Sequence, residues 1–184
     1  AILFGPNADR RNEMNALLVI DMLKDFIEEG GALDCGDRAR EIVPFVRRKV
    51  EEFRREKQLV VFVCDSHRPD DPEFRLFPRH SVKGTEGARI IAALPVGPKD
   101  IIIEKTRYSA FYKTALEKTL RKHRADQVHV VGVCTSICVM DTVGDLRDRD
   151  YPVIVYQDGV ADFDPEAHRF SLGRMEKIYG AKVV

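Results

Sequence analysis

In the stretch Val128-His129-Val130-Val131-Gly132-Val133-Cys134-Thr135-Ser136-Ile137-Cys138-Val139, a continuous apolar run passes directly into a predicted helix. The apolar run, residues 128–133, is typical of a strand that is buried on both faces. The helix is predicted to begin near Thr135, which places Cys138 close to its start. A buried strand that leads into a helix is typical of a layered α/β fold.

The same alternation of strand and helix extends along the chain. Short apolar runs predict six strands, at residues 16–21, 59–64, 100–104, 128–133, 153–157 and 181–184. Amphipathic patterns predict helices at residues 42–53, 85–93, 109–124, 136–149 and 165–179, the last with Asp164 as its N-cap. We therefore expect an α/β fold: a three-layer, doubly wound sheet of about six parallel strands with helices on both faces.

The composition describes one ordinary globular domain. Among 184 residues, 30 Lys and Arg balance 30 Asp and Glu, and no apolar run approaches the roughly 20 residues of a membrane span. We therefore expect no nucleic-acid partner and no membrane partner. The four cysteines lack the spacing of a disulfide framework, which favours reduced thiols and a cytoplasmic location. Residues 1–13 are interpreted as an N-terminal extension or remnant, and residues 14–184 as the domain.

Chemically capable side chains stand where the predicted strands end. They are Asp21, Asp65, Lys105 and Cys138, which follow or end the first four strands. Ligands of doubly wound sheets bind beyond the carboxyl ends of the strands, so these side chains are expected to meet at one edge. A lone Cys is usually a packing residue, but the position of Cys138 near a helix start predicts a lowered thiol pKa.

Three of these residues form a set suited to acyl transfer. Asp21 would accept a proton, the ammonium of Lys105 would stabilise an anion, and Cys138 would attack a carbonyl to give a thioester. The alternative is an Asp–Lys salt bridge beside a cysteine that serves only packing.

A second group lies in the long connection at residues 66–84. Asp65 and His67 alternate along an extended chain and so face the same side, while Glu73 and His80 follow in the same connection. Carboxylate and imidazole ligands suit a divalent metal such as zinc, iron or manganese. The alternative is a set of solvated side chains in a polar loop.

Aromatic residues flank the same predicted edge. They are Phe26, Phe77, Tyr108 and Phe111. Each one alone is accounted for by packing in the core or in a loop. Together, on loops at one sheet edge, they would suit a pocket for a flat ring.

Five segments, in this order along the chain, resemble the isochorismatase-like cysteine hydrolases, and among them the nicotinamidase (pyrazinamidase) subgroup. They are VIDMLKDF (19–26), DSH (65–67), LFPRHSVKGT (76–85), EKTRYSAF (104–111) and GVCTSICV (132–139). The resemblance runs from about residue 15 to the end of the chain, and it implies a hydrolase domain over residues 14–184.

The resemblance implies specific catalytic roles. Cys138 would be the nucleophile, Asp21 the general base and acid, and Lys105 the third member of the triad. A cis peptide bond before Cys134 would let the N–H groups of Cys134 and Cys138 form an oxyanion hole. Many relatives carry Ala at the position of Cys134.

The resemblance also implies a metal site and an aromatic pocket. The implied metal ligands are Asp65, His67, His80 and, as in only some members, Glu73. The implied ring contacts are Phe26 and Phe77, which sandwich the ring, and Tyr108, which forms a wall. One divalent ion, zinc before iron or manganese, would hold the pyridine nitrogen of the substrate.

We therefore predict an enzyme of NAD salvage that hydrolyses nicotinamide, or a related pyridine or pyrazine carboxamide, to the acid and ammonia. One alternative is an amidohydrolase of the same family that acts on ureido or carbamoyl groups, and another is a non-catalytic metal-binding or interaction module. Isochorismate cleavage is disfavoured, because that chemistry needs no thiol nucleophile such as Cys138. A homo-oligomer is left open.

Overall fold

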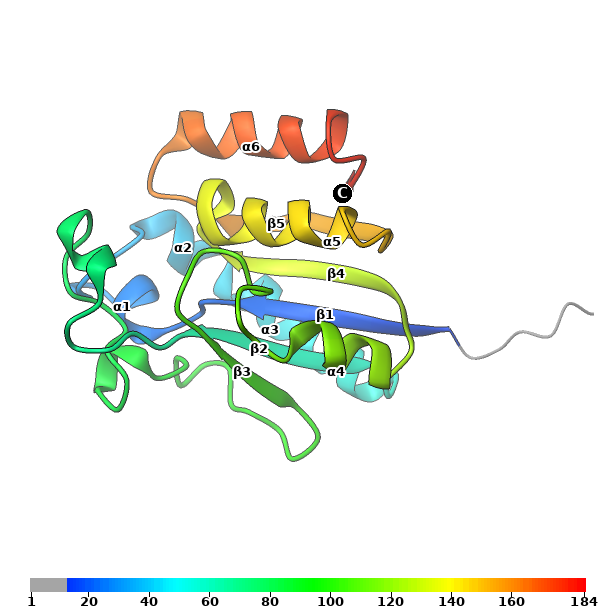
Figure 1. The fold of residues 1–184 in the computed structure, drawn as a ribbon, viewed down its shortest axis with the longest axis horizontal. Helices are drawn as coiled ribbons and strands as arrows, with labels where there is room; N and C mark the ends of the chain where they lie inside the picture. The colour runs from blue at the N-terminus through cyan, green and yellow to red at the C-terminus, as the bar shows by residue number, and fades with distance from the viewer. Residues whose placement is uncertain (1–12) are drawn as a thin grey trace, which may run out of the picture.

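The computed structural model describes residues 13–184, which form a six-stranded parallel sheet with helices on both faces (Figure 1). The strand order is β3-β2-β1-β4-β5-β6. The strands are β1 (Met14–Ile20), β2 (Leu59–Asp65), β3 (Ile101–Lys105), β4 (Ala125–Val133), β5 (Val153–Ala161) and β6 (Lys182–Val183). The predicted doubly wound α/β sheet is confirmed. The predicted extension at residues 1–13 lies, except for Glu13, outside the described residues.

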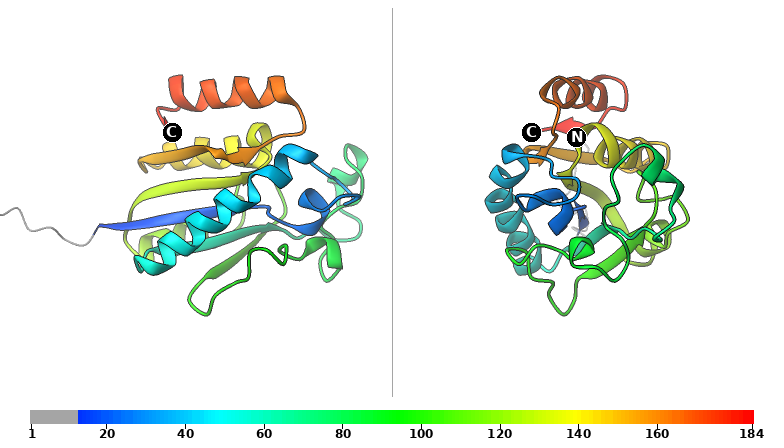
Figure 2. Two further views of the ribbon diagram at one scale, coloured as in Figure 1. Left: turned by 180° about the vertical axis from the view of Figure 1, so that it is seen from behind. Right: turned by 90° about the vertical axis from the view of Figure 1, so that its left-hand side faces the viewer.

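Two apolar cores sandwich the sheet, and alternate residues of the central strand β1 contribute to each. Leu18 and Ile20 belong to the core on one face, and Leu17 and Val19 to the core on the other. Helices cover both faces of the sheet (Figure 2). The first core lies under α4 (Leu116–Lys122), α5 (Met140–Arg147) and α6 (Pro165–Lys177), and the second under α1 (Lys24–Ile27), α2 (Asp37–Glu41) and α3 (Val43–Arg55). Because both faces are covered, the central strands β1 and β2 are buried along most of their length rather than alternating.

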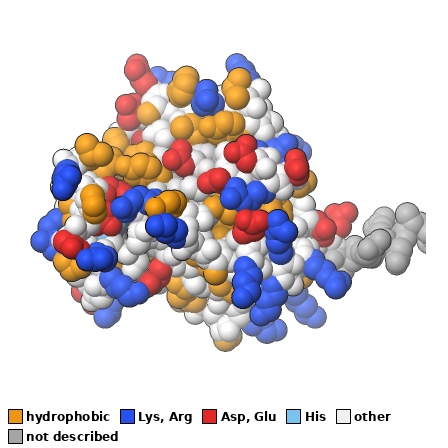
Figure 3. Space-filling model, viewed as in Figure 1, with side chains coloured by type: hydrophobic (Ala, Val, Ile, Leu, Met, Phe, Trp, Pro, Cys, Tyr) orange, Lys and Arg blue, Asp and Glu red, His pale blue; other side chains and the backbone are white. Residues whose placement is uncertain are grey.

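Charged side chains are spread over the outer face of the layer of α4, α5 and α6. Lys and Arg intermingle with Asp and Glu over the face that carries α4, α5 and α6 (Figure 3). This mixed surface agrees with the balanced composition of the chain. Within residues 13–184, no helix combines the length and the apolarity that crossing a membrane requires.

The helix predicted at residues 85–93 is wrong, since this segment contains only the short 3₁₀ turn Glu86–Ala88. Beyond this turn, its backbone bonds to the segment that follows β1. Lys24 N donates to Arg89 O at 2.9 Å, and Ile91 N donates to Met22 O at 3.1 Å. Long-range backbone bonds have therefore replaced the helical ones.

The helix predicted at residues 109–124 is also shorter than expected, because α4 begins only at Leu116. Ala110 N donates to the hydroxyl of Thr142, and Lys113 has a φ of 53°, which a right-handed helix does not allow. The helix predicted at residues 165–179 is confirmed as α6. Asp164 caps it as predicted, since its carboxylate accepts from the N–H groups of residues 166 and 167.

Gly132 allows β4 to approach β1 very closely at the carboxyl edge. It has a φ of +122°, and a Cβ at this position would lie 2.0 Å from the carbonyl oxygen of Ile20. Only glycine fits both the backbone angle and the contact. The close approach places the residues after β4 against those after β1, which is where the candidate catalytic groups lie.

Gly132→Ala is expected to lower the free energy of unfolding by more than about 3 kcal/mol, because the strained φ and the backbone clash act together. The matched control is Gly173→Ala within α6, where a Cβ meets nothing within 4 Å. The control should raise the free energy of unfolding by about 0.5–1 kcal/mol. Urea denaturation followed by circular dichroism measures both. A Gly132→Ala variant as stable as the wild type would contradict the tight contact.

Candidate active site

Four side chains with catalytic potential meet at the carboxyl edge of the sheet. Asp21 follows β1, and Asp65 ends β2. Lys105 ends β3, and Cys138 lies in the π-helical turn Thr135–Val139 that follows β4. All four residues are buried, with at most 7% of their surface exposed. The structure therefore brings together the four residues that the sequence placed at strand ends.

Lys105 is the centre of this group. Its Nζ lies 2.9 Å from Asp21 Oδ2 and donates to Cys138 Sγ at 3.3 Å. The same ammonium pairs with the carboxylate of Asp65. The other oxygen of Asp21 accepts a hydrogen bond from Asp65 N at 2.8 Å. A carboxylate, an ammonium and a thiol are thus in one connected set of contacts.

The charges in this group set its protonation. Burial and the charge of Asp65 raise the pKa of Asp21 to about 6, against the lowering effect of Lys105. Burial disfavours the ammonium of Lys105, but Asp21 and Asp65 outweigh this and raise the pKa of Lys105 well above its ordinary value. Asp21 is therefore the group that can exchange a proton near neutral pH, while Lys105 stays charged.

The predicted lowering of the Cys138 pKa is wrong. Burial and the two neighbouring carboxylates raise the pKa of this thiol well above its ordinary value, despite the ammonium of Lys105. The backbone N–H of Ser136 in this turn donates to Asp162 Oδ2 at 2.7 Å and not to the thiol of Cys138. Cys138 is therefore a thiol at rest and needs a base beside it to become a nucleophile.

A second cluster of candidate ligands adjoins Asp65. One ligand atom from each of Asp65, His67 and His80 lies within 4.8 Å of the others, and all three residues are buried. Glu73 Oε1 lies 3.9 Å from His67 Nε2 and 3.8 Å from His80 Nε2. Among the described residues, His67 Nε2 and Glu73 Oε2 are buried without a hydrogen-bond partner. Such unsatisfied nitrogen and oxygen atoms fit a divalent cation.

Backbone hydrogen bonds hold the loop after β2 so that His80 returns to His67. His67 N donates to Ser81 O, and Lys83 N donates to His67 O, each at 2.9 Å. Ser81 N also donates to Asp25 Oδ2 at 2.7 Å, which fastens the loop to the segment after β1. The candidate ligand cluster is therefore positioned by the same sheet edge as the candidate catalytic group.

Two charged residues beside this cluster were missed by the sequence analysis. Asp71 Oδ2 lies 3.2 Å from His67 Nδ1 and 3.1 Å from Arg107 Nη1. Asp71 Oδ1 accepts from Glu73 N and so caps a short 3₁₀ turn. A carboxylate beside the outer nitrogen of a histidine typically orients that histidine toward a metal. The Asp71-Pro72 pair signals a cap in the sequence, but nothing local indicates the contact with His67.

One pocket joins the two clusters. It is lined by Asp21, Cys134 and Cys138 on the side of the first cluster, and by Asp65, Glu73 and His80 on the side of the second cluster. The predicted ring contacts Phe26, Phe77 and Tyr108 also line it, together with Leu33, Val133, Ile137 and Phe163, which were not predicted. The rings of Phe26 and Phe77 stand edge-on to His80, at centroid distances of 5.4 and 6.3 Å. Phe111 instead packs against the guanidinium of Arg149 outside this pocket.

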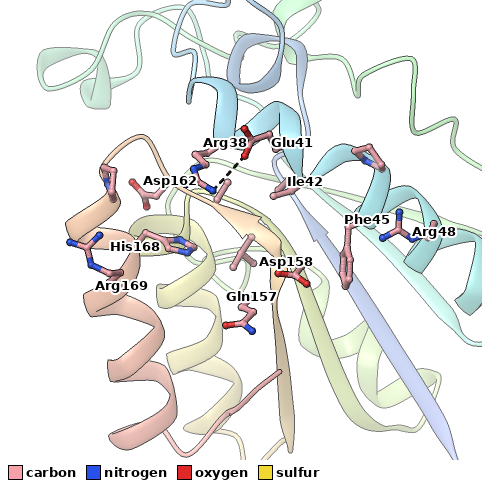
Figure 4. Close-up of a pocket in the computed structure, with 14 residues that line it drawn as sticks. Arg38, Glu41, Ile42, Phe45, Arg48, Gln157, Asp158, Asp162, His168 and Arg169 are labelled. Carbon is pink, nitrogen blue, oxygen red and sulfur yellow. Dashed lines mark ion pairs between the residues drawn. The ribbon is translucent and has the colours of Figure 1, made fainter.

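The turn that carries Cys138 is supported from behind by β5 and α6. Asp162 accepts from Ser136 N, and His168 Nδ1 lies 2.9 Å from Thr135 Oγ1. Figure 4 shows Asp162 and His168 in the wall of a separate groove of about 590 Å³ beside α2. His168 is partly buried and in contact with the turn. The peptide bond between Val133 and Cys134 is cis, as the resemblance implies.

Comparison with known proteins identifies the family. A model described as the isochorismatase domain matches residues 15–184. The chain belongs to the isochorismatase family. The match covers every strand but the first residue of β1, and it includes both clusters described above.

Similar solved structures include proteins named as nicotinamidases, pyrazinamidases and an amidase. Nicotinamidase/pyrazinamidase PncA from Bacillus subtilis is 38% identical with a TM-score of 0.89, covering 93% of this chain and 99% of its own. N-carbamoylsarcosine amidase from Thermoplasma acidophilum is 39% identical with a TM-score of 0.85, covering 92% and 95%. Pyrazinamidase of Pyrococcus horikoshii in complex with zinc is 32% identical with a TM-score of 0.87, covering 92% and 98%.

A curated relative shows that membership of the family does not decide activity. The probable inactive nicotinamidase At3g16190 of Arabidopsis thaliana is 37% identical, over 89% of this chain and 88% of its own length. Activity and substrate therefore depend on the side chains of the site itself.

Proposed function

We propose that the protein is a nicotinamidase, a metal-assisted cysteine amidohydrolase that converts nicotinamide to nicotinate and ammonia. The observation that carries the proposal is one pocket in which the Asp21, Lys105 and Cys138 group adjoins the Asp65, His67 and His80 cluster. The first group suits acyl transfer, and the second suits binding of a heteroaromatic ring nitrogen through a metal. The product of the proposed reaction, nicotinate, points to a role in NAD salvage in the cytoplasm. This role and this location stay predictions.

Asp21 acts as the proton carrier in the proposed reaction. With a pKa of about 6 it is mainly ionised at neutral pH, so it can accept the thiol proton as Cys138 attacks the carboxamide carbon. Asp21 then gives this proton to the departing ammonia, which leaves a nicotinoyl thioester on Cys138. A water molecule deprotonated by Asp21 hydrolyses the thioester and regenerates the thiol.

Lys105 and the turn after β4 stabilise the charges that develop. Lys105 Nζ contacts both Asp21 and Cys138, so it offsets negative charge on whichever of the two is ionised. The N–H groups of Cys134 and Cys138 are the proposed donors to the oxyanion. One such donor is typically worth about 10²–10³ in rate.

Asp65, His67 and His80, with Glu73 as a fourth ligand, would hold a divalent metal, for which zinc suits the mixed imidazole and carboxylate donors. Bound there, the metal supplies a Lewis acid for the pyridine nitrogen of the substrate. Phe26, Phe77 and Tyr108 line the pocket beside this cluster and would pack on the ring.

Cys138→Ala is expected to remain folded and to lower ammonia release from nicotinamide by at least about 10³-fold, because it removes the nucleophile. The matched control is Cys64→Ala, which removes another buried thiol that lies outside the pocket and should leave turnover within a few-fold of wild type. Thermal unfolding checks that both variants fold. Retained turnover in the Cys138→Ala variant would remove this residue as the nucleophile.

Asp71→Asn is expected to weaken zinc binding by about 10–100-fold, since it removes the carboxylate beside His67 Nδ1. Asp70→Asn is the matched control, because Asp70 is exposed and pairs only with Arg68 among the described residues. Competition with a chromophoric chelator measures the affinity of each purified variant for zinc. Equal affinities for the two variants would show that Asp71 does not support the cluster.

A second candidate is hydrolysis of a carbamoyl group, which the similarity to N-carbamoylsarcosine amidase favours. Ammonia release from nicotinamide and from an N-carbamoyl amino acid, before and after chelation, separates the two. We expect turnover of nicotinamide alone, with KM raised at least about tenfold by the chelator and restored by zinc. Turnover of the carbamoyl compound, unchanged by chelation, would favour the second candidate.

A further inference from the structure

The thiols of Cys35 and Cys134 lie against each other although 99 residues separate them in the sequence. Their Sγ atoms are 3.1 Å apart. Cys35 lies in the connection between α1 and α2, and Cys134 directly follows β4. Both side chains are buried, with 1% and 6% of their surface exposed, and neither thiol takes part in the proposed reaction.

We propose that Cys35 and Cys134 form an oxidative modification site, at which a hydroperoxide produces a reversible disulfide. In the first step the sulfur of Cys134 attacks the peroxide, the O–O bond breaks, and an alcohol or water leaves to give a sulfenic acid. In the second step the sulfur of Cys35 displaces the hydroxyl group as water and forms the S–S bond. The two thiols together lose two electrons and two protons, and the peroxide is reduced.

The order of the two steps follows from access. Cys134 lines the same pocket as Asp21 and Cys138, so a small oxidant that enters the pocket reaches its sulfur. Cys35 does not line the pocket and is less exposed than Cys134, which makes it the resolving thiol. The neighbouring thiol and burial raise the pKa of Cys134 well above its ordinary value, so a large excess of oxidant is needed.

The bond needs only a small movement. A disulfide has an S–S distance of about 2.05 Å, so the two sulfur atoms have to approach by about 1 Å from their present 3.1 Å. Cys35 is hydrogen-bonded to two residues in the wall of the pocket, Phe26 and Leu33. Cys35 N donates to Phe26 O at 2.9 Å, and its thiol donates to Leu33 O at 3.6 Å. The disulfide would thus couple this wall to the backbone of Cys134.

The coupling has a catalytic consequence that rests on the proposed function. Cys134 N is a proposed oxyanion donor, and catalytic groups tolerate displacements of only about 0.5 Å. A shift of Cys134 toward Cys35 therefore weakens the oxyanion contact while Cys138 itself remains a thiol. The expected loss is at least about tenfold in turnover, less than the roughly 10²–10³ typical of removing one such donor, because the donor is displaced rather than removed.

The test treats the whole protein with excess hydrogen peroxide, alkylates the remaining thiols, and maps peptides by mass spectrometry without and with dithiothreitol. We expect a linked pair of peptides containing Cys35 and Cys134, two hydrogens lighter than the reduced pair, that dithiothreitol separates. Cys35→Ala should abolish the link and leave Cys134 open to sulfenic-acid reagents. Cys64→Ala is the matched control and should retain the link.

Oxidation of Cys138 alone, or a link between Cys134 and Cys138, would overturn the proposal. The wild-type result stands even where the Cys35→Ala variant fails to fold.

Turnover of nicotinamide per remaining Cys138 thiol is measured on the same samples. A link in protein that never hydrolyses nicotinamide rejects the proposed function and keeps the modification site. Normal turnover without a link rejects the site alone, and a link without loss of turnover rejects the coupling.

Discussion

The buried ammonium of Lys105 is the constraint on which the carboxyl edge of the sheet depends. A cation without exposure to water is tolerated only with partners, and here the partners come from neighbouring strands, namely Asp21 after β1 and Asp65 at the end of β2. Removing one member of such a group typically costs about 3–5 kcal/mol, because the remaining charge is left unpaired. Asp65 is the direct register partner of Lys105 in the β2–β3 pair, so a slip of one residue would separate them.

The same ammonium divides the two carboxylates into different roles. Burial raises the pKa of both acids, but the charges of Lys105 and His67 outweigh burial at Asp65 and lower its pKa. At Asp21, burial and the charge of Asp65 prevail, and the pKa rises to about 6. One carboxylate therefore stays ionised beside the histidines, and the other is suited to carry a proton. Two acids with pKa values pushed apart by their surroundings are a recurrent basis for acid–base catalysis.

Much of the site was predictable because strand ends obey a general rule. Continuous apolar runs identified the strands, and the doubly wound topology placed Asp21, Asp65, Lys105 and Cys138 at one edge. Contacts that depend on the path of a loop were not predictable, as with Asp71 beside His67 or Phe163 in the pocket. The false helix at residues 85–93 has the same cause, because its backbone bonds to distant segments.

The wrong direction for the Cys138 pKa shows where local reasoning ends. The start of a helix was expected to favour the thiolate, but burial is the largest effect, and together with the carboxylates from other strands it outweighs the ammonium of Lys105 and raises the pKa of Cys138. A thiol that stays protonated at rest needs its base within the same buried group, and the register of β1, β2 and β3 supplies that base together with Lys105. The reactivity that we propose for Cys138 therefore depends on the assembled sheet edge rather than on its own helix.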